Sequence, residues 1–164
     1  MSNIYKPPSY KNIDYGNINV FLAGSIEMGK AEDWQTRISD ALVQRFENVD
    51  VYNPRRDDWD SSWEQKIDNK PFYDQVTWEL NALSLADVIL MYLQPETLSP
   101  ISLLELGLHA TGKKLIVCCP DGFWRKGNVD IVCQRYSIPV VTRLSDLFVE
   151  ACTAISFVSE GGIM

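Results

Sequence analysis

The sequence has little positive charge, and it lacks both a long apolar run and the composition of a signal peptide. Lys and Arg together number 15 against 22 Asp and Glu, which gives a formal net charge of −7. Broad binding of nucleic acid needs a basic surface, so this balance argues against that function. No apolar run approaches the roughly 20 residues of a membrane-spanning helix. Residues 1–10 are polar and contain proline, unlike a signal peptide. We therefore expect a cytoplasmic protein without a membrane partner.

Cysteine and histidine are also scarce, with four and one in the chain. Cys118 and Cys119 are adjacent in an apolar run, which suits buried, reduced thiols better than a disulfide or a metal site. A catalytic cysteine is the alternative, but no histidine is placed to activate one. His109 is the only histidine, and in a helix such a residue is more often a packing or surface residue. We expect no metal site and no cofactor.

Apolar, β-rich runs alternate with helical patterns along the chain, and no internal repeat or low-complexity segment interrupts them. Strands are expected at 18–23, 49–52, 87–93, 114–119 and 139–142, and helices at 31–46, 72–85, 99–111, 128–136 and 144–156. Nearly continuous apolar strands indicate burial on both faces, which is typical of a parallel sheet covered by helices. The sequence predicts one α/β domain over residues 1–164, an open, doubly wound, five-stranded parallel sheet. Residues 1–15 are expected to be a loosely structured N-terminal segment.

Glycine, charged residues and tryptophan are frequent directly after the carboxyl ends of the predicted strands. These stretches are 24–26, 53–59, 95–102 and 121–128. In an open parallel sheet the ligand crevice lies outside the carboxyl ends of the strands. We therefore expect the functional site at this edge.

Glu105 is the most unusual carboxylate, because it is placed among leucines in a predicted helix. Ser99 is a natural N-cap for that helix and Pro100 suits its first turn. A buried glutamate is costly unless it has a partner or a chemical role. The positive end of the helix would favour its ionised, nucleophilic form. Glu105 is either a nucleophile or general base, or a structural carboxylate paired with a lysine or arginine, and the residues alone leave both open.

A second carboxylate, Glu79, lies on the preceding predicted helix. It follows Gln75 by four residues, so both side chains could face one cleft. The alternative is a solvated helix face. Asp87, at the start of a predicted strand, is expected to have a structural role.

Two loops add binding groups. After the first predicted strand, Gly24 would let a ligand approach the backbone, but neither a GxGxxG motif nor a Walker lysine is present. The acidic Glu27 argues against a phosphate at that place. The segment from Asn53 to Trp59 (NPRRDDW) combines arginines, carboxylates and an aromatic face, which can read the edge and face of a base. A salt-bridged surface loop is an equal alternative.

Taken in order, these segments resemble the nucleoside 2-deoxyribosyltransferase family. The matching segments are FLAGSIEMGKAEDWQ from Phe21, YNPRRDDWD from Tyr52, QVTWELNALSLADVIL from Gln75, SPISLLELGLHATGK from Ser99 and GFWRKGNVDIVCQRY from Gly122. The ELG element, with an upstream acidic helix residue and an AD strand, is the specific part. The resemblance implies a flavodoxin-like fold and a pentosyltransferase of nucleoside salvage. Such an enzyme cleaves the N-glycosidic bond of a 2′-deoxynucleoside and passes the sugar to a free nucleobase.

The resemblance also implies roles for particular residues. Glu105 would be the nucleophile that forms a covalent deoxyribosyl ester, and Glu79 the acid, where many relatives carry aspartate. The implied substrate-binding residues are Gly24, Ser25, Ile26, Asn53, Arg55, Asp57, Trp59, Trp78, Asn128 and Asp130, although a tryptophan such as Trp78 is more often a core or interface anchor. The last two match a loop that relatives lend to a neighbouring subunit, so a homo-oligomer with sites completed across subunits is expected. No metal or cofactor is implied.

Two other functions compete with this interpretation. One is an N-glycosidase that hydrolyses nucleosides or nucleoside 5′-monophosphates. Related nucleotide hydrolases hold the phosphate with serines and often an arginine near the GS loop. Glu27 stands there in this chain and favours an unphosphorylated nucleoside, although Arg125, Lys126 or Arg135 could supply charge from elsewhere. The other is a non-catalytic protein that binds or senses a nucleotide, because fold alone does not settle function.

Overall fold

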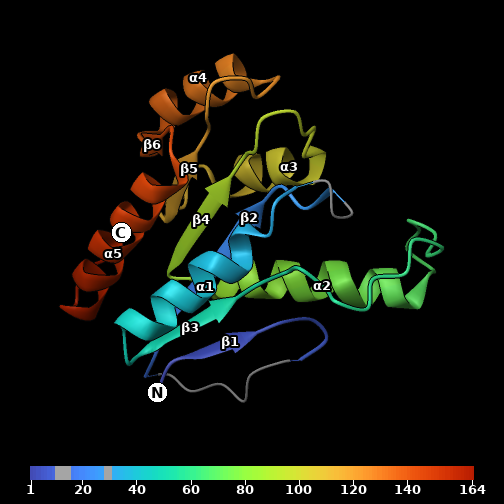
Figure 1. The fold of residues 1–164 in the computed structure, drawn as a ribbon, viewed down its shortest axis with the longest axis horizontal. Coiled ribbons are helices and arrows are strands. Elements are labelled where there is room, and N and C mark those ends of the chain that lie inside the picture. Colours follow the sequence, from blue (N-terminus) through green and yellow to red (C-terminus); the bar gives the residue numbers. More distant parts are fainter. Residues whose placement is uncertain (10–15, 28–30) are drawn as a thin grey trace.

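The computed structural model describes residues 1–9, 16–27 and 31–164, and in these ranges a six-stranded parallel sheet carries helices on both faces (Figure 1). The strands lie side by side in the order β1 (Asn3–Tyr5), β3 (Val49–Tyr52), β2 (Ile18–Gly24), β4 (Val88–Tyr92), β5 (Leu115–Cys118) and β6 (Val140–Val141). All neighbouring pairs are parallel. Without β1, this is the 2-1-3-4-5 order of flavodoxin-like sheets. The predicted fold class is confirmed.

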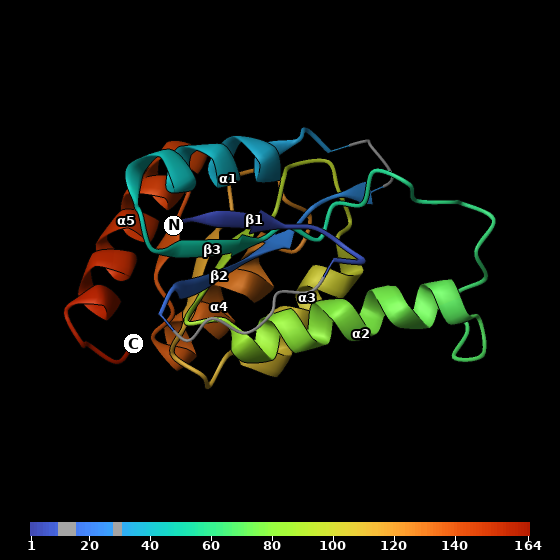
Figure 2. The same cartoon turned by 90° about the horizontal axis from the view of Figure 1, so that it is seen from below.

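Two layers of helices cover the sheet, and Figure 2 shows α1 and α2 on opposite sides of the strands. The helices are α1 (Trp34–Arg45), α2 (Lys70–Leu85), α3 (Pro100–His109), α4 (Lys126–Tyr136) and α5 (Leu144–Ser159). Helices α2, α3 and α4 pack on one face, while α1 and α5 pack on the other. Along β2, Phe21 and Ala23 enter the first core, and Val20 and Leu22 enter the second. The continuous apolar run of this strand is the consequence of burial on both faces.

Strand β1 differs from the prediction of a five-stranded sheet and a loosely structured N-terminal segment. Residues 3–5 pair in parallel with β3 and extend the sheet at its edge. Asn3 Nδ2 donates a hydrogen bond of 2.9 Å to Asp50 Oδ1, and the Tyr5 ring stacks on Tyr52 with centroids 5.4 Å apart. Three residues are too few to show a strand period in sequence, so the pairing depends on the edge that β3 offers. Residues 10–15 of the segment lie outside the described residues.

The remaining elements lie close to their predicted positions. The long connection after β3 is irregular up to Lys70, as the sequence predicts. Helix α2 then begins with Asn69 as its N-cap, whose side chain accepts a hydrogen bond from Phe72 N, and with proline in its first turn. In the described part of the chain, no helix has the length and apolar character needed to cross a membrane.

Candidate functional site

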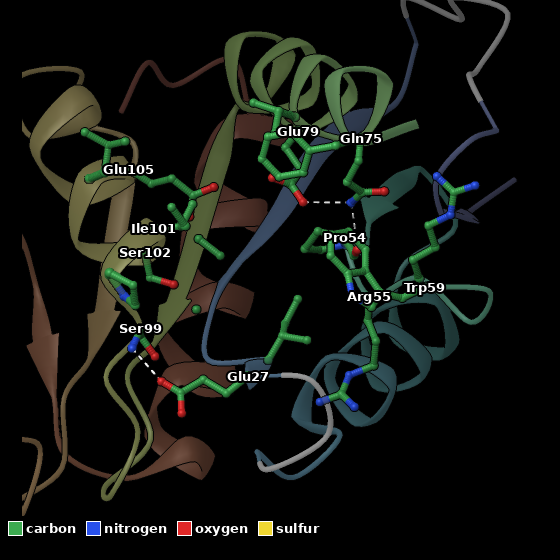
Figure 3. Close-up of a pocket in the computed structure, with 18 of the residues that line it drawn as sticks. Glu27, Pro54, Arg55, Trp59, Gln75, Glu79, Ser99, Ile101, Ser102 and Glu105 are labelled. Carbon is green, nitrogen blue, oxygen red and sulfur yellow. Dashed lines mark hydrogen bonds between the residues drawn. The ribbon is translucent and has the colours of Figure 1, made fainter. Parts of the chain in front are cut away.

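A cavity of about 900 Å³ opens at the carboxyl edge of the sheet, between α2, α3 and the connection after β3 (Figure 3). The loops after β2 and β4 reach it from the two sides of the point where the strand order reverses, which is where ligands bind in open α/β sheets. Its lining comprises Ala23, Gly24, Ile26, Glu27, Asp33, Pro54, Arg55, Arg56, Asp57, Trp59, Ser61, Gln65, Phe72, Gln75, Val76, Glu79, Leu80, Ser99, Pro100, Ile101, Ser102, Leu104, Glu105 and Leu108.

Glu105 lines this cavity from the second turn of α3 and is only 8% exposed. Burial raises the pKa of its carboxyl group to about 8, and the charge of Glu79 adds to the rise. This result is opposite to the sequence-based expectation that the helix N-terminus favours the ionised form. The influence of the helix dipole falls off within the first turn, whereas loss of water acts fully on a carboxyl group in the second.

Glu79 approaches the same cavity from α2, and Figure 3 shows the Glu79 and Glu105 side chains on the two facing helices. Burial raises the pKa of Glu79, while a hydrogen bond from Gln75 opposes the rise. Gln75 Nε2 donates to Glu79 Oε1 at 2.7 Å and to the Pro54 carbonyl at 3.3 Å. Gln75 therefore fixes Glu79 relative to the loop after β3.

Neither carboxylate forms an ion pair with a lysine or arginine among residues 1–9, 16–27 and 31–164. The structural alternative for Glu105, a helix carboxylate neutralised by a cation, is thus absent from the described part. A buried and a partly buried carboxyl group that share one cavity without a counter-ion are typical of acid–base and nucleophilic sites.

The loop after β3 forms the wall opposite α3. The Asn53 side chain accepts a hydrogen bond of 2.9 Å from Arg55 N. The Arg55 guanidinium donates to the carbonyl groups of Ala31 and Glu32, at 3.3 and 3.1 Å. Trp59 meets Trp63 edge-on, with ring centroids 5.1 Å apart. These contacts hold the loop against the start of α1 and present Arg55 and Trp59 to the cavity.

A cluster of hydrogen-bonded hydroxyl groups lies at the start of α3. The side-chain N-cap that the sequence predicts at Ser99 does not form. Ser99 takes the N-cap position with a left-handed φ of 45°, and its side chain makes no capping bond. Its Oγ lies 2.6 Å from Ser25 Oγ and 2.9 Å from Thr97 Oγ1. Ser25 Oγ also accepts a hydrogen bond of 2.9 Å from Gln94 N. The cluster ties the loop after β2 to the loop after β4.

The structure places seven of the predicted site residues around the cavity: Gly24, Ile26, Arg55, Asp57, Trp59, Glu79 and Glu105. Ser25 and Asn53 are buried behind its wall and act through the contacts described above. Trp78 is 2% exposed and packs against Phe21 and Tyr52 in the core, with its indole N–H donating to the Ser9 carbonyl.

Asn128 and Asp130 lie elsewhere, on α4, and do not line the cavity. The resemblance suggests a loop at this place, whereas the structure has the helix that the sequence pattern predicts at 128–136, beginning at Lys126. Asn128 is exposed, and Asp130 forms an ion pair of 3.1 Å with Lys126.

Sequence reasoning missed the apolar walls of the cavity and Ser102. Phe72, Val76 and Leu80 line it from α2, and Ile101, Leu104 and Leu108 from α3. Ser102 is 4% exposed and precedes Glu105 by one helical turn. Helical spacing counted from the two glutamates would have found these residues, because side chains three or four positions apart share a helix face.

Within the described ranges, no group of three or more His, Cys, Asp or Glu side chains is arranged to hold a metal ion. The four cysteines are free thiols, and burial raises the pKa of Cys118 to about 12 and of Cys119 to about 11.

Comparisons with known proteins concern the fold and the family of the chain. One solved structure, a conserved protein from Enterococcus faecalis V583, is similar with a TM-score of 0.60 and 14% identity, over 84% of this chain and 98% of that one. That similarity concerns the fold. No curated protein sequence matches the chain. The family model described as "Nucleoside 2-deoxyribosyltransferase like" matches residues 17–123, which include both glutamates and the whole cavity lining but end before α4. Because this match covers well over half of the sequence, the chain belongs to the nucleoside 2-deoxyribosyltransferase-like family.

Proposed function

We propose that the protein is a nucleoside 2-deoxyribosyltransferase, which moves the sugar of a 2′-deoxynucleoside from one nucleobase to another. This proposal is carried by one observation: the buried carboxyl group of Glu105 and the partly buried carboxyl group of Glu79 share one cavity on facing helices. Membership of the family supports the substrate class.

The two carboxyl groups supply one nucleophile and one acid if they hold one proton between them. Burial and mutual repulsion raise the pKa of Glu105 to about 8, so near neutral pH the pair keeps a proton. Gln75 donates to Glu79 and leaves Glu105 without that support. Transfer of the proton from Glu105 to Glu79 yields a carboxylate at the sugar and an acid at the base.

In the first half-reaction, an Oε atom of Glu105 attacks the anomeric carbon of the bound 2′-deoxynucleoside. The C1′–Oε bond forms while the C1′–N bond breaks, through an oxocarbenium-like transition state. The leaving base takes a proton from Glu79 at a ring nitrogen, directly or through water. The products are a deoxyribosyl ester of Glu105 and a neutral base.

In the second half-reaction, a ring nitrogen of the incoming base attacks C1′ from the opposite face. The ester bond breaks, Glu105 leaves as a carboxylate, and the N–H proton of the incoming base returns to Glu79. Two inversions retain the configuration of the sugar. Water in place of the base would give hydrolysis by the same steps.

Two unpaired polar atoms support a base position between α2 and the loop after β3. Gln75 Oε1 and Trp59 Nε1 are buried and have no hydrogen-bond partner among the described residues. Buried polar atoms are normally satisfied. Both residues line the cavity, so a small rotation of each side chain would offer an acceptor and an indole donor to the edge of a nucleobase.

We further propose that a second copy of the chain completes the site. Helix α3 exposes Ile101, Leu104 and Leu108 at the rim of the cavity, each more than half exposed. A cluster of exposed apolar side chains is typical of an interface. Asn128 and Asp130 would then contribute to the site of a neighbouring subunit, since they do not reach the cavity of their own.

Incubation of the protein with 2′-deoxyinosine and adenine, followed by chromatography, tests the reaction. Deoxyadenosine is expected, because the ester of Glu105 would be captured by adenine. Formation of hypoxanthine without deoxyadenosine would mean that the protein hydrolyses the nucleoside and does not transfer its sugar. Absence of turnover for every nucleoside and nucleotide supplied would overturn the enzymatic proposal and leave a binding protein.

Substitution of the nucleophile tests the mechanism. Glu105→Ala and Glu105→Gln are each expected to lower kcat by at least about 1,000-fold, because neither side chain can form the ester. Intact-protein mass spectrometry of the wild type, quenched during turnover, should show the mass of one added deoxyribosyl group. Glu150→Gln, an exposed position on α5, is the matched control. Wild-type activity in Glu105→Ala would refute the assignment.

A further inference from the structure

Ser102 places a hydroxyl group in the wall of the cavity, one helical turn before Glu105 on α3. The residue is only 4% exposed and lines the cavity. Figure 3 shows its side chain between those of Glu105 and Ser99, with the hydroxyl oxygen directed into the cavity. Residues three positions apart are neighbours on the surface of a helix, so Ser102 and Glu105 face the same part of the cavity.

The Ser102 hydroxyl group has no hydrogen-bond partner among the residues that the structure describes. Serine and threonine side chains inside a helix can donate to the carbonyl group one turn earlier. Ser84 on α2 and Thr153 on α5 do so, with distances of 2.8 and 3.2 Å. Ser102 makes no such bond, and a buried hydroxyl group without a partner is unfavourable. Its partner must therefore come from the cavity.

The neighbouring polar groups at this end of α3 are already engaged within the protein. Ser99 Oγ lies 2.6 Å from Ser25 Oγ and 2.9 Å from Thr97 Oγ1. The Glu27 carboxylate accepts a hydrogen bond of 2.8 Å from Ser99 N. Apart from the glutamate, the remaining lining residues of α3 are a proline, an isoleucine and two leucines. On the α3 side of the described lining, Ser102 thus supplies the hydroxyl group that is left for a ligand.

We propose that Ser102 binds a hydroxyl group of the deoxyribose, so that the site recognises the sugar as well as the base, an inference that rests on the proposed function. The proposed base position lies across the cavity, between α2 and the loop after β3. The sugar of a nucleoside with C1′ at Glu105 then lies against α3. Three residues along a helix correspond to a rise of about 4.5 Å. This distance is similar to that from C1′ to the 3′- or 5′-hydroxyl group, to which Ser102 can donate or from which it can accept.

The test measures kcat/KM of transfer to adenine for 2′-deoxyinosine, 2′,3′-dideoxyinosine and 2′,5′-dideoxyinosine. In the wild type, loss of the hydroxyl group that Ser102 binds should lower kcat/KM by at least about 10-fold, and the analogue affected identifies that group. In Ser102→Ala, the same loss should cost less than about 3-fold, because no partner remains for the hydroxyl group. Comparing each analogue between the two proteins cancels its intrinsic reactivity.

Ser39→Ala is the matched control for the removal of a buried hydroxyl group. Ser39 lies on α1, is 1% exposed and has an unpartnered Oγ among the described residues, but it does not line the cavity. Its substitution should leave all three values of kcat/KM unchanged. Alanine is the residue that most favours a helix, so both variants are expected to fold.

Equal use of the three nucleosides by the wild type would overturn the inference while transfer itself stands, and this result needs no variant. A Ser102→Ala protein that loses activity equally on all three would also overturn it, since the residue would then act through Glu105 or through the helix. The same holds for a variant that discriminates among the three as the wild type does. Absence of turnover of every 2′-deoxynucleoside supplied would instead overturn the proposed function, and the inference with it.

Discussion

Burial separates Glu105 from the surface carboxylates of the chain, and it makes the stability of the fold depend on pH. The folded protein holds the pKa of Glu105 at about 8, above its ordinary value of 4.5. Below pH 4.5 the group is protonated in both the folded and the unfolded chain, so it costs nothing. As the pH rises toward 8, the unfolded chain ionises first, and the free energy of unfolding falls. The proposed nucleophile thus lowers the stability of the fold near neutral pH.

Glu105→Gln is therefore expected to stabilise the protein near neutral pH. The difference between pKa values of 4.5 and about 8 corresponds to a cost of about 3 kcal/mol at pH 7, which the neutral amide avoids. Thermal unfolding of wild type and variant should show a higher Tm for the variant at pH 7 and a gap that closes toward pH 4.5. Glu150→Gln, on the exposed side of α5, should give the same small change at both pH values. A gap that is widest at low pH would contradict the assignment of the buried carboxyl group.

At the scale of the elements, the close approach of β2 and β4 determines where the loop after β2 enters the cavity. Gly24 ends β2 with a φ of 135°, and a Cβ built there would lie 2.2 Å from the Tyr92 carbonyl oxygen. The neighbouring amide of Ser25 donates to that same carbonyl at 2.9 Å. A larger residue would push apart the two strands at the point from which Ile26 and Glu27 extend.

Gly24→Ala is expected to lower the free energy of unfolding by more than about 2 kcal/mol, because it adds backbone strain and a clash with backbone atoms. Gly107→Ala is the matched control within α3, where an added Cβ would meet no atom within 4 Å. There the loss of glycine should stabilise the helix by up to about 1 kcal/mol. Urea unfolding measures both changes. Equal effects of the two substitutions would rule out the close approach of the strands.

At the scale of the whole molecule, one rim of the cavity is apolar and exposed. Ile101, Leu104 and Leu108 are 60%, 59% and 57% exposed, and Leu80 of α2 is 46% exposed. These side chains line the cavity and face outward, so the site lacks a cover on this side. A second copy seated here would bury the rim and exclude water from the proposed ester of Glu105, which would favour transfer over hydrolysis.

Leu104→Glu is expected to shift the protein from an oligomer to a monomer, because it places a charge in the proposed interface. Sedimentation velocity over a range of concentrations measures the state, and transferase activity should fall with it. Val149→Glu makes the same kind of change on α5, where the side chain is 60% exposed, and should leave both readouts unchanged. A monomeric, fully active wild type would refute the interface.

Much of the fold and part of the candidate site can be predicted from this sequence, and the residues show why. The run 49–52 is a strand with the predicted bounds, and the predicted helix at 72–85 begins only two residues earlier, at Lys70. Glu79 and Glu105 both reach the predicted edge of the sheet. These features follow from the spacing of apolar residues and from the order of the elements, and both are local properties of the sequence.

Long-range contacts account for what could not be predicted. β1 forms because β3 offers it an edge. The Ser99 side chain does not cap α3, because its hydroxyl group is hydrogen-bonded to Ser25, 74 positions away. Trp78 enters the core, although its spacing is equally compatible with the cavity.

By itself the sequence determined the α/β architecture, the edge of the sheet that carries the cavity and the two glutamates that line it. Only the tertiary structure decided the raised pKa of Glu105, the hydrogen bond from Ser99 N to Glu27 and the position of Asn128 and Asp130 away from the cavity. The physical reason is that secondary structure follows from local periodicity, whereas desolvation, charge coupling and hydrogen-bond partners depend on which distant residues are brought together.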